Sequence, residues 1–360
     1  VFAYDVGDVK NSYIGEPTVN FITELGDPVQ EIARGEFGQY FNLVPVFETH
    51  GLVPYTLSME MKGNIPGQCL VYMQNGSYTK YGFIGSWVTL TTEWQRFVFP
   101  NLTPAGPNAT WQANTPNDHR AMLATYTVYG SGRNPTIRNI QLEHGAHNTP
   151  FIAGTRSTVE GLIDLTGNSS IDLANVSFDS NAQMTFDGTD DVITVPMQNL
   201  KPTLSITQEV VVYINSNTTQ VFIGAQYGTS SGNSYALWLN GANNLAGGVN
   251  IGGSFNYQSQ TYTITTSKWY HFIHTYDGTD QKLYVNGVVV RSWPTAGTIT
   301  YNDNNTLLAI GNDWNGSGYN IGASLATHGK QDITKIYNRA LTADEVTQNY
   351  RHYKTRFNLS

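Results

Sequence analysis

The chain has 360 residues, enough for two domains or one large β domain, and its net charge of −8 comes without a basic stripe. This balance argues against nucleic-acid binding, and the lack of any run of about 18 apolar residues argues against a membrane-spanning helix. Charged residues make up 13 %, about half the ~25 % of an average soluble domain. Because Gly, Tyr, Asn, Ser and Thr are abundant, we expect a β-rich protein with many turns and a neutral, hydrogen-bonding surface.

The single cysteine, Cys69, excludes a disulfide framework within one chain. It lies in an apolar run, Cys69–Tyr72, where a buried and unreactive thiol is expected. The N-terminal VFAYDVGDV has neither the basic region nor the apolar stretch of a signal peptide, and it lacks an initiator Met. These features favour a protein that is assembled in a bacterial cytoplasm and released later, as a processed product or as a fragment of a longer chain.

A first module is predicted over residues 1–152, as an antiparallel sandwich of short strands separated by Gly, Pro and Asn clusters. Its clearest strand is Tyr55–Lys62, in which alternate residues starting at Tyr55 are apolar and share one face. No helix pattern of useful length is visible in this module. Further strands are expected at Val19–Leu25, Cys69–Gln74, Trp87–Leu90, Glu93–Phe99, Ala121–Tyr129 and Thr136–Leu142.

Residues 153–160 are expected to form a linker, and a second module is assigned to residues 161–353, followed by a tail at 354–360. The strongest signal of the second module is a hairpin. Its strands are Trp269–Tyr276 and Lys282–Val285, and Asp-Gly and Asn-Gly dipeptides mark its turns. Further strands are expected at Met184–Phe186, Val192–Val195, Leu204–Ile214, Gln220–Ala225, Ala236–Leu239, Tyr262–Thr265, Leu307–Gly311 and Gly329–Tyr337.

One helix is predicted, near the end of the chain. Thr342-Ala-Asp-Glu345 has the spacing of a capping box, in which the two side chains satisfy free backbone N–H groups. Val346, Asn349 and Tyr350 follow at helical spacing. The expected fold class is therefore all-β, with two antiparallel sandwich (jelly-roll) modules in tandem and one short C-terminal helix.

Four motifs of the second module, taken in order, resemble laminin-G-like, concanavalin A-type jelly rolls. They are Gly161–Asn168, Met184–Ile193, Trp269–Gly287 and Gln331–Val346. The resemblance implies a fold that usually binds glycans or proteins and only sometimes catalyses. It does not identify the ligand, because function resides in sites that vary on a shared fold.

The first module resembles the carbohydrate-binding-like sandwich often found in phage tail and fibre proteins, through Tyr55–Ser58, Thr92–Arg96, Ile140–Gly145 and Thr149–Ile152. The tandem order of the two modules resembles virion proteins of tailed marine bacteriophages. This resemblance implies a non-enzymatic tail-fibre, capsid-fibre or decoration component on the virion surface, which binds host surface glycan or attaches to the particle. It also implies other virion proteins as partners and a homo-oligomer such as a trimer, although no heptad repeat is present.

Two alternatives stay open. One is an ancillary carbohydrate-binding region of a secreted bacterial glycosidase or adhesin, and the other is a virion protein without a ligand. Catalysis is not expected, because the E-x-D-x-x-E strand that supplies the two carboxylates of concanavalin A-type glucanases is missing. His271 and His274 fall on opposite faces of one strand, which prevents both from binding one metal, and packing is the better interpretation of His271.

Glycan binding requires exposed rings beside amide and hydroxyl groups, because rings cover the apolar faces of pyranoses. Two stretches of the second module have this composition, Tyr235–Asn240 and the Gly-rich Asn312–Asn320, and Trp111 has similar surroundings in the first. For each residue the alternative is subunit contact or loop packing. The candidate glycan-binding residues are Trp314, Tyr319, Asn315, Trp238, Asn240 and Trp111.

No cofactor is certain, and calcium is the one candidate. The resemblance implies it, since jelly rolls often hold this ion with carboxylate and carbonyl oxygens in their loops. The alternative is that acidic residues in turns accept hydrogen bonds from their own backbone. The candidate ligands are Asp187, Asp190, Asp191 and Asp313 in the second module and Glu143 in the first.

Overall fold

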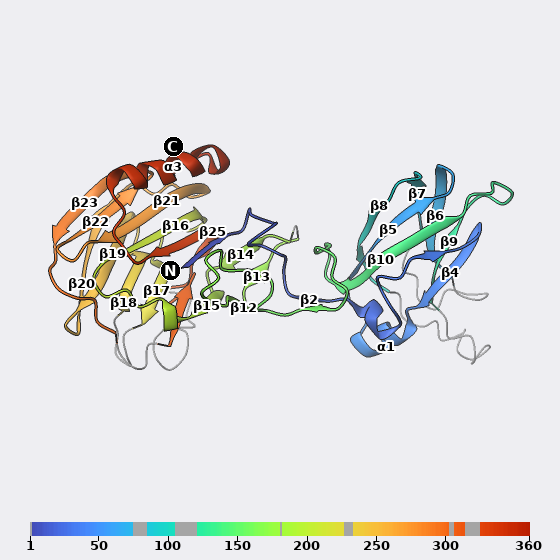
Figure 1. Cartoon of the computed structure of the whole chain (residues 1–360), viewed down its shortest axis with the longest axis horizontal. Coiled ribbons are helices and arrows are strands. Elements are labelled where there is room, and N and C mark those ends of the chain that lie inside the picture. The colour runs from blue at the N-terminus through green and yellow to red at the C-terminus, as the bar shows by residue number, and fades with distance from the viewer. Residues whose placement is uncertain are drawn as a thin grey trace. The chain divides into compact units, whose positions relative to one another are not determined.

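The computed structural model describes residues 2–74, 85–104, 121–180, 182–226, 233–301, 306–313 and 325–360. The chain divides into two compact units, each with its own hydrophobic core (Figure 1). The C-terminal unit comprises residues 1–16, 157–179 and 183–360, and the N-terminal unit comprises residues 17–156 and 180–182. Antiparallel sheets dominate both units, so the predicted all-β class is confirmed.

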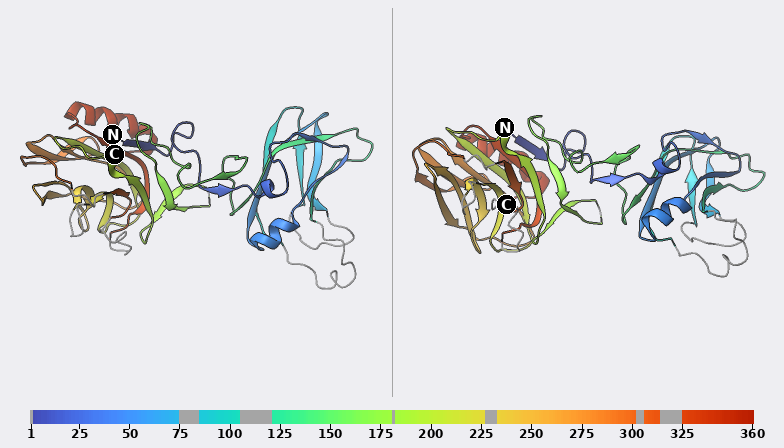
Figure 2. Two further views of the ribbon diagram at one scale, coloured as in Figure 1. Left: turned by 60° about the horizontal axis from the view of Figure 1, so that its bottom comes forward. Right: turned by 90° about the horizontal axis from the view of Figure 1, so that it is seen from below.

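Two sheets form the sandwich of the C-terminal unit (Figures 1 and 2). The eight-stranded sheet contains, in spatial order, β13 (Ser177–Phe178), β14 (Met184–Asp187), β25 (His328–Tyr337), β16 (Ile206–Ile214), β21 (Lys268–Tyr276), β22 (Asp280–Val285) and β23 (Val288–Pro294), with β1 (Phe2–Asp5) paired to β25. The seven-stranded sheet contains β12 (Asp172–Asn175), β15 (Val192–Pro196), β24 (Leu307–Ile310), β17 (Gln220–Gln226), β18 (Asn233–Leu239), β19 (Asn244–Ile251) and β20 (Ser254–Thr261). A short 3-10 helix, η2 (Met197–Asn199), follows β15.

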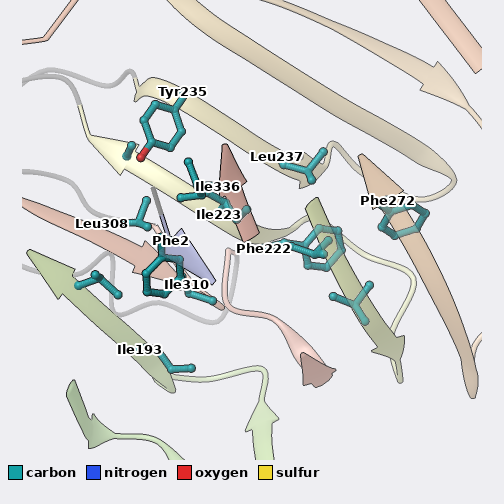
Figure 3. Packing of buried hydrophobic residues seen from close by; sticks show 14 of the residues in the cluster. Phe2, Ile193, Phe222, Ile223, Tyr235, Leu237, Phe272, Leu308, Ile310 and Ile336 are labelled. Carbon is teal, nitrogen blue, oxygen red and sulfur yellow. The ribbon is translucent and has the colours of Figure 1, made fainter. Parts of the chain in front are cut away.

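Alternate residues of the two sheets fill the core between them (Figure 3). Phe222 of β17 and Phe272 of β21 stack across it, with 5.7 Å between ring centroids. Tyr235 and Leu237 of β18 also point inward and are fully buried. Each side chain of this size contributes about 1.5–3 kcal/mol by leaving water, so the inward face fixes the register of each strand.

The first strand pairs far along the chain. In β1, Phe2 lies opposite Ile336 of β25, and Phe2 and Tyr4 are buried in the core of the C-terminal unit. Residues 1–16 therefore belong to this unit, whereas the sequence placed them at the start of the first module. The difference arises because the sequence of the four residues in β1 does not indicate that their partner strand lies more than 300 positions away.

The hairpin predicted from Asp-Gly and Asn-Gly is present as β21 and β22, and the chain continues into β23, which was not predicted. Strand β19 was also missed, and the strand predicted at Tyr262–Thr265 is wrong because the chain pairs earlier, as β20. Gly247-Gly248 resembles a turn in the sequence but lies within β19. An ideal Cβ at Gly247 would lie 2.8 Å from the His274 ring, so the glycine is required by packing.

Helix α3 (Ala343–Phe357) lies against the eight-stranded sheet (Figure 2). The capping box is confirmed, since the Thr342 hydroxyl accepts from the backbone N–H of Glu345 and the Glu345 carboxylate accepts from the backbone N–H of Thr342. The expected tail at 354–360 is wrong. The helix continues to Phe357, and Phe357 and Leu359 are buried against the sheet.

A buried carboxylate anchors this helix. Glu209 of β16 is fully buried and accepts hydrogen bonds from His271 Nε2 at 2.8 Å, from the Tyr337 hydroxyl at 2.8 Å and from Asn349 Nδ2 of α3 at 2.9 Å. Burial alone would raise the pKa of Glu209, but the hydrogen bond and charge of His271 hold that pKa below its usual value. The interpretation of His271 as a packing residue agrees with this contact.

His274 faces the opposite side of β21. It is buried between Gln208 and Gln281, at 2.9 Å from each, and burial lowers its pKa to about 4. The two histidines thus belong to separate environments, as the strand geometry predicted.

The N-terminal unit contains two four-stranded sheets around one core. The first contains β3 (Ile32–Ala33), β10 (Pro135–His144), β5 (Tyr55–Gly63) and β8 (Gln95–Leu102), and the second contains β4 (Phe37–Asn42), β9 (Met122–Tyr126), β6 (Gly67–Gln74) and β7 (Gly85–Leu90). The short strands β2 (Thr18–Val19) and β11 (Thr155–Arg156) pair with each other, and η1 (Phe21–Glu24) and α1 (Val44–His50) complete the unit. Helix α1 was not predicted, because seven residues are too few to show a helical period. Cys69 is buried as expected.

No helix among the residues that the structure describes is long and apolar enough to cross a membrane.

The Glu209 contacts predict a pH-dependent stability. Glu209→Gln removes the charge that three donors share, and we expect the C-terminal unit to lose about 3 kcal/mol of unfolding free energy at pH 7. Because the folded pKa is depressed, the stabilisation is fully present above the unfolded pKa of about 4.3 and is lost as the pH falls through the folded value. Urea unfolding between pH 7 and pH 3 measures this.

The matched control is Asp344→Asn, an exposed acidic residue in the first turn of the same helix, with an expected cost under about 1 kcal/mol. Equal losses for the two variants, or an unchanged acid profile for Glu209→Gln, would contradict the role given to Glu209.

Candidate functional site

Three aromatic side chains gather on the outer face of the seven-stranded sheet. Trp238 comes from β18, and Phe255 and Tyr257 come from the edge strand β20. The ring centroids lie 5.2 Å apart for Trp238 and Tyr257, 5.8 Å for Trp238 and Phe255, and 5.7 Å for Phe255 and Tyr257. We refer to these three residues as the aromatic patch.

Strand alternation places the aromatic patch on this face. Tyr235 and Leu237 of β18 point into the core, so Trp238 points away from it. Tyr257 is 46 % exposed, whereas Trp238 and Phe255 are half-buried. Each ring therefore keeps part of its surface in solvent while its neighbours fix its orientation. Each aromatic pair contributes about 0.5–1.5 kcal/mol beyond the burial of its surface.

Small residues of β19 form the floor beneath the rings. Ala246 lies opposite Trp238, and Gly248 lies opposite Tyr257. An ideal Cβ at Gly248 would lie 2.6 Å from the Tyr257 Cβ, so only glycine allows this close approach. Ala246 is fully buried even though it faces away from the core, which agrees with a floor that is covered by side chains.

The strands that carry and support the aromatic patch are polar but contain no charged residue. The sequence contains no charged residue between Glu209 and Lys268, a range that includes β18, β19 and β20. Asn240 is exposed in the turn after β18, and Asn244 begins β19, where its Oδ1 accepts from the Thr261 hydroxyl at 3.1 Å. Rings beside neutral amide and hydroxyl groups suit a neutral polyhydroxylated ligand better than an ion.

Only part of the predicted glycan-binding set is brought together. Trp238 lies near the end of β18, and Asn240 follows that strand. Trp111, Trp314, Asn315 and Tyr319 lie outside the described residues.

Sequence reasoning missed Phe255 and Tyr257. Their spacing of two residues was a usable signal, because it places both rings on one face of any strand that contains them. The sequence could not show that this strand is next to β19.

The aspartates predicted as calcium ligands lie in one turn. Ligand atoms of Asp187, Asp190 and Asp191 are within 4.8 Å of one another, the only such acidic group among the described residues. Asp191 is buried and accepts from the backbone N–H and hydroxyl of Ser177, and from the backbone N–H of Asp187. Burial raises the pKa of Asp191. These bonds favour the alternative, a turn that is stabilised by its own acidic side chain, and calcium binding here stays a prediction.

Asp313 is not a member of that group. It follows β24, and its Oδ1 would lie 2.6 Å from an ideal Cβ at Gly224 of β17. Asn233 Nδ2 lies 3.5 Å from its Oδ2.

Glu143 of the N-terminal unit is fully buried at the end of β10. Its carboxylate accepts from the Thr18 hydroxyl at 2.9 Å, from Gln141 Nε2 at 2.8 Å, and from the backbone N–H and hydroxyl of Thr149 at 2.9 and 2.7 Å. These neutral donors saturate the carboxylate, which therefore holds the segment around Thr149 against β10. The donor set does not fit a calcium ion at this position.

Comparison with known families matches residues 187–347 to the concanavalin A-like lectin/glucanases superfamily, in the Laminin_G_3 model. The jelly roll expected from the four motifs is thereby confirmed for this part of the C-terminal unit. The comparison does not extend to the N-terminal unit. A search of curated proteins finds no match.

Several solved structures are similar at low identity. The receptor-binding domain of botulinum neurotoxin D is 15 % identical, with a TM-score of 0.43, and the match covers 56 % of this chain and 52 % of that chain. Domain 4 of AbnA, a GH43 extracellular arabinanase from Geobacillus stearothermophilus solved with arabinotriose, is 21 % identical, with a TM-score of 0.39 and coverages of 53 % and 92 %. A heptameric SAP-like pentraxin from Limulus polyphemus is 18 % identical, with a TM-score of 0.34 and coverages of 45 % and 78 %. The chain thus spans about half the length of the neurotoxin domain.

The floor of the aromatic patch gives a direct test of its geometry. Gly248→Ala introduces a Cβ against Tyr257, and we expect a loss of about 1–3 kcal/mol of unfolding free energy and a changed near-ultraviolet circular dichroism signal from the displaced rings. Gly154→Ala is the control, because no heavy atom lies within 4 Å of its added Cβ. A native ring signal and native stability in Gly248→Ala would show that β19 and β20 are not packed as described.

Proposed function

We propose that the C-terminal unit is a non-catalytic binding module that holds neutral glycans on the aromatic patch. The observation that carries this proposal is the set of three partly exposed rings in mutual contact on strands that contain no charged residue. The faces of pyranose rings stack on such side chains, and the neighbouring amide and hydroxyl groups bond the sugar hydroxyls.

The absence of carboxylates from β18, β19 and β20 supports a binding role rather than hydrolysis. Glycoside hydrolysis requires a pair of carboxyl groups on either side of the scissile bond. The three strands that carry and support the aromatic patch contain no acidic residue. A sugar held over these rings therefore has no acid or nucleophile from the strands beneath it.

A glycan array tests the proposed binding. Wild type is expected to bind neutral glycans, and Tyr257→Ala and Trp238→Ala are each expected to weaken binding about fivefold, since one aromatic contact contributes about 1 kcal/mol. Val288→Ala is the control, because Val288 is 64 % exposed on β23 of the other sheet. Equal binding by all four proteins would contradict the placement of the site on the aromatic patch.

We further propose that the protein is a component of a bacteriophage particle, as a tail-fibre, capsid-fibre or decoration protein that attaches to host surface glycan. The support is the tandem order of motifs in the sequence, together with a neutral surface that suits weak contacts multiplied by many copies on one particle. Mass spectrometry of purified virions is expected to detect the chain. If the chain is instead found as one region of a secreted glycosidase that also has a catalytic module, the ancillary carbohydrate-binding role is favoured.

A further inference from the structure

A second set of exposed rings crosses the N-terminal unit. In the sheet of β4, β9, β6 and β7, Phe37 lies opposite Tyr126, Tyr126 opposite Leu70, and Leu70 opposite Trp87. One apolar side chain from each of four neighbouring strands is thus aligned in a single line perpendicular to the strands. We refer to these four residues as the apolar row.

The apolar row faces away from the core. On β6, Cys69 and Val71 are buried in the core of this unit, so Leu70 between them points to the other face. Phe37 is 47 % exposed and Trp87 is 52 % exposed, and both are large apolar side chains in regular strands. Contiguous exposed apolar surface of this kind marks an interaction site more often than an isolated exposed residue does.

The size of the apolar row indicates the kind of ligand. Each aromatic side chain presents about 150–250 Å² when it is fully covered, so four partly exposed residues offer on the order of 300 Å². A stable protein–protein contact requires about 800 Å² from each partner, which is well above this value. Three strand spacings of about 4.8 Å give the row a length of roughly 14 Å, which suits an extended ligand rather than a single sugar ring.

The composition of the four strands favours a neutral ligand. Strands β4, β9, β6 and β7 contain no charged residue. Two register positions from the row, and therefore on the same face, Gln68 Nε2 donates to the Thr89 hydroxyl at 2.9 Å. Two positions away on the other side, Tyr72 lies opposite Ala124. Phosphate groups, acidic peptides and nucleic acids would require cations that these strands lack.

We propose that the apolar row is a second saccharide-binding surface, which holds an extended neutral oligosaccharide across the four strands. The rings of Phe37, Tyr126 and Trp87 cover pyranose faces. The amide and hydroxyl groups of Gln68 and Thr89 bond the sugar hydroxyls beside them. This surface belongs to a different unit from the aromatic patch and does not depend on it.

Affinity electrophoresis of the full chain tests the proposal. The gels contain one soluble neutral polysaccharide each (arabinan, xylan, galactomannan or a mixed-linkage glucan). All proteins carry Tyr257→Ala, so that the aromatic patch is weakened and the apolar row is measured by itself. The background protein is expected to be retarded by at least one polysaccharide, and adding Trp87→Ala or Phe37→Ala is expected to weaken that interaction about fivefold.

The matched control is Trp94→Ala, which removes a half-buried tryptophan of the same unit that precedes β8 of the other sheet. The Trp94 ring stacks on Arg138, and the guanidinium carbon lies 4.0 Å from the ring centroid. It is expected to leave retardation unchanged. Urea unfolding of Trp87→Ala is expected to match the background protein, which separates lost binding from lost folding.

Two results would overturn the proposal. One is retardation that is absent with all four polysaccharides or unaffected by both apolar-row substitutions. The other is a dimer in sedimentation that Trp87→Ala dissociates, which would make the row a contact between two copies of the chain. Loss of array binding by Tyr257→Ala with intact retardation here would show that the two surfaces act separately.

Discussion

The register of the antiparallel sheets is the constraint on which both the cores and the proposed binding surfaces depend. Because side chains alternate between the two faces of a strand, fixing which residues enter the core also fixes which residues face solvent. In β18 the burial of Tyr235 and Leu237 places Trp238 outside, and in β6 the burial of Cys69 and Val71 places Leu70 outside. A slip of one residue would bury the rings and expose the core, so the free energy of the core also maintains both surfaces.

In the C-terminal unit, the buried carboxylate of Glu209 and the close packing at Gly248 determine what covers the outer face of each sheet. Helix α3 covers the eight-stranded sheet, and it is held there by Asn349 on Glu209 and by Phe357 in the core beneath it. The seven-stranded sheet carries the aromatic patch instead, because Gly248 lets Tyr257 approach β19. The C-terminal unit thus uses one outer face for its helix and the other for the proposed ligand.

The sequence predicted the features that depend on local chemistry. The turns at Asp277-Gly278 and Asn286-Gly287, the capping box at Thr342 and the motif order of the jelly roll follow from short-range preferences, and the structure contains them. Features that depend on long-range pairing were missed. Strand β1 joins β25 across most of the chain, and Gly247-Gly248 resembles a turn unless the approaching His274 and Tyr257 are known.

The same limit applies to the candidate site. Trp238 was identified because aromatic and amide residues surround it in the sequence. Its partners Phe255 and Tyr257 lie on a strand that the sequence did not predict. Glu143 was considered as a metal ligand because its surroundings were unknown, and its four neutral donors come from three separate positions in the chain. Composition therefore identified one member of the aromatic patch, whereas its other two members depend on strand order.

In the proposed function, Trp238 and its neighbours contact a neutral sugar. The most direct measurement is an NMR titration of the tryptophan indole N–H signals with a neutral oligosaccharide that the protein binds. We expect the Trp238 signal to shift and saturate, and the signal of Trp269, which packs against Phe357 under the helix, to stay in place. Saturable binding that leaves the Trp238 signal unmoved would contradict the account.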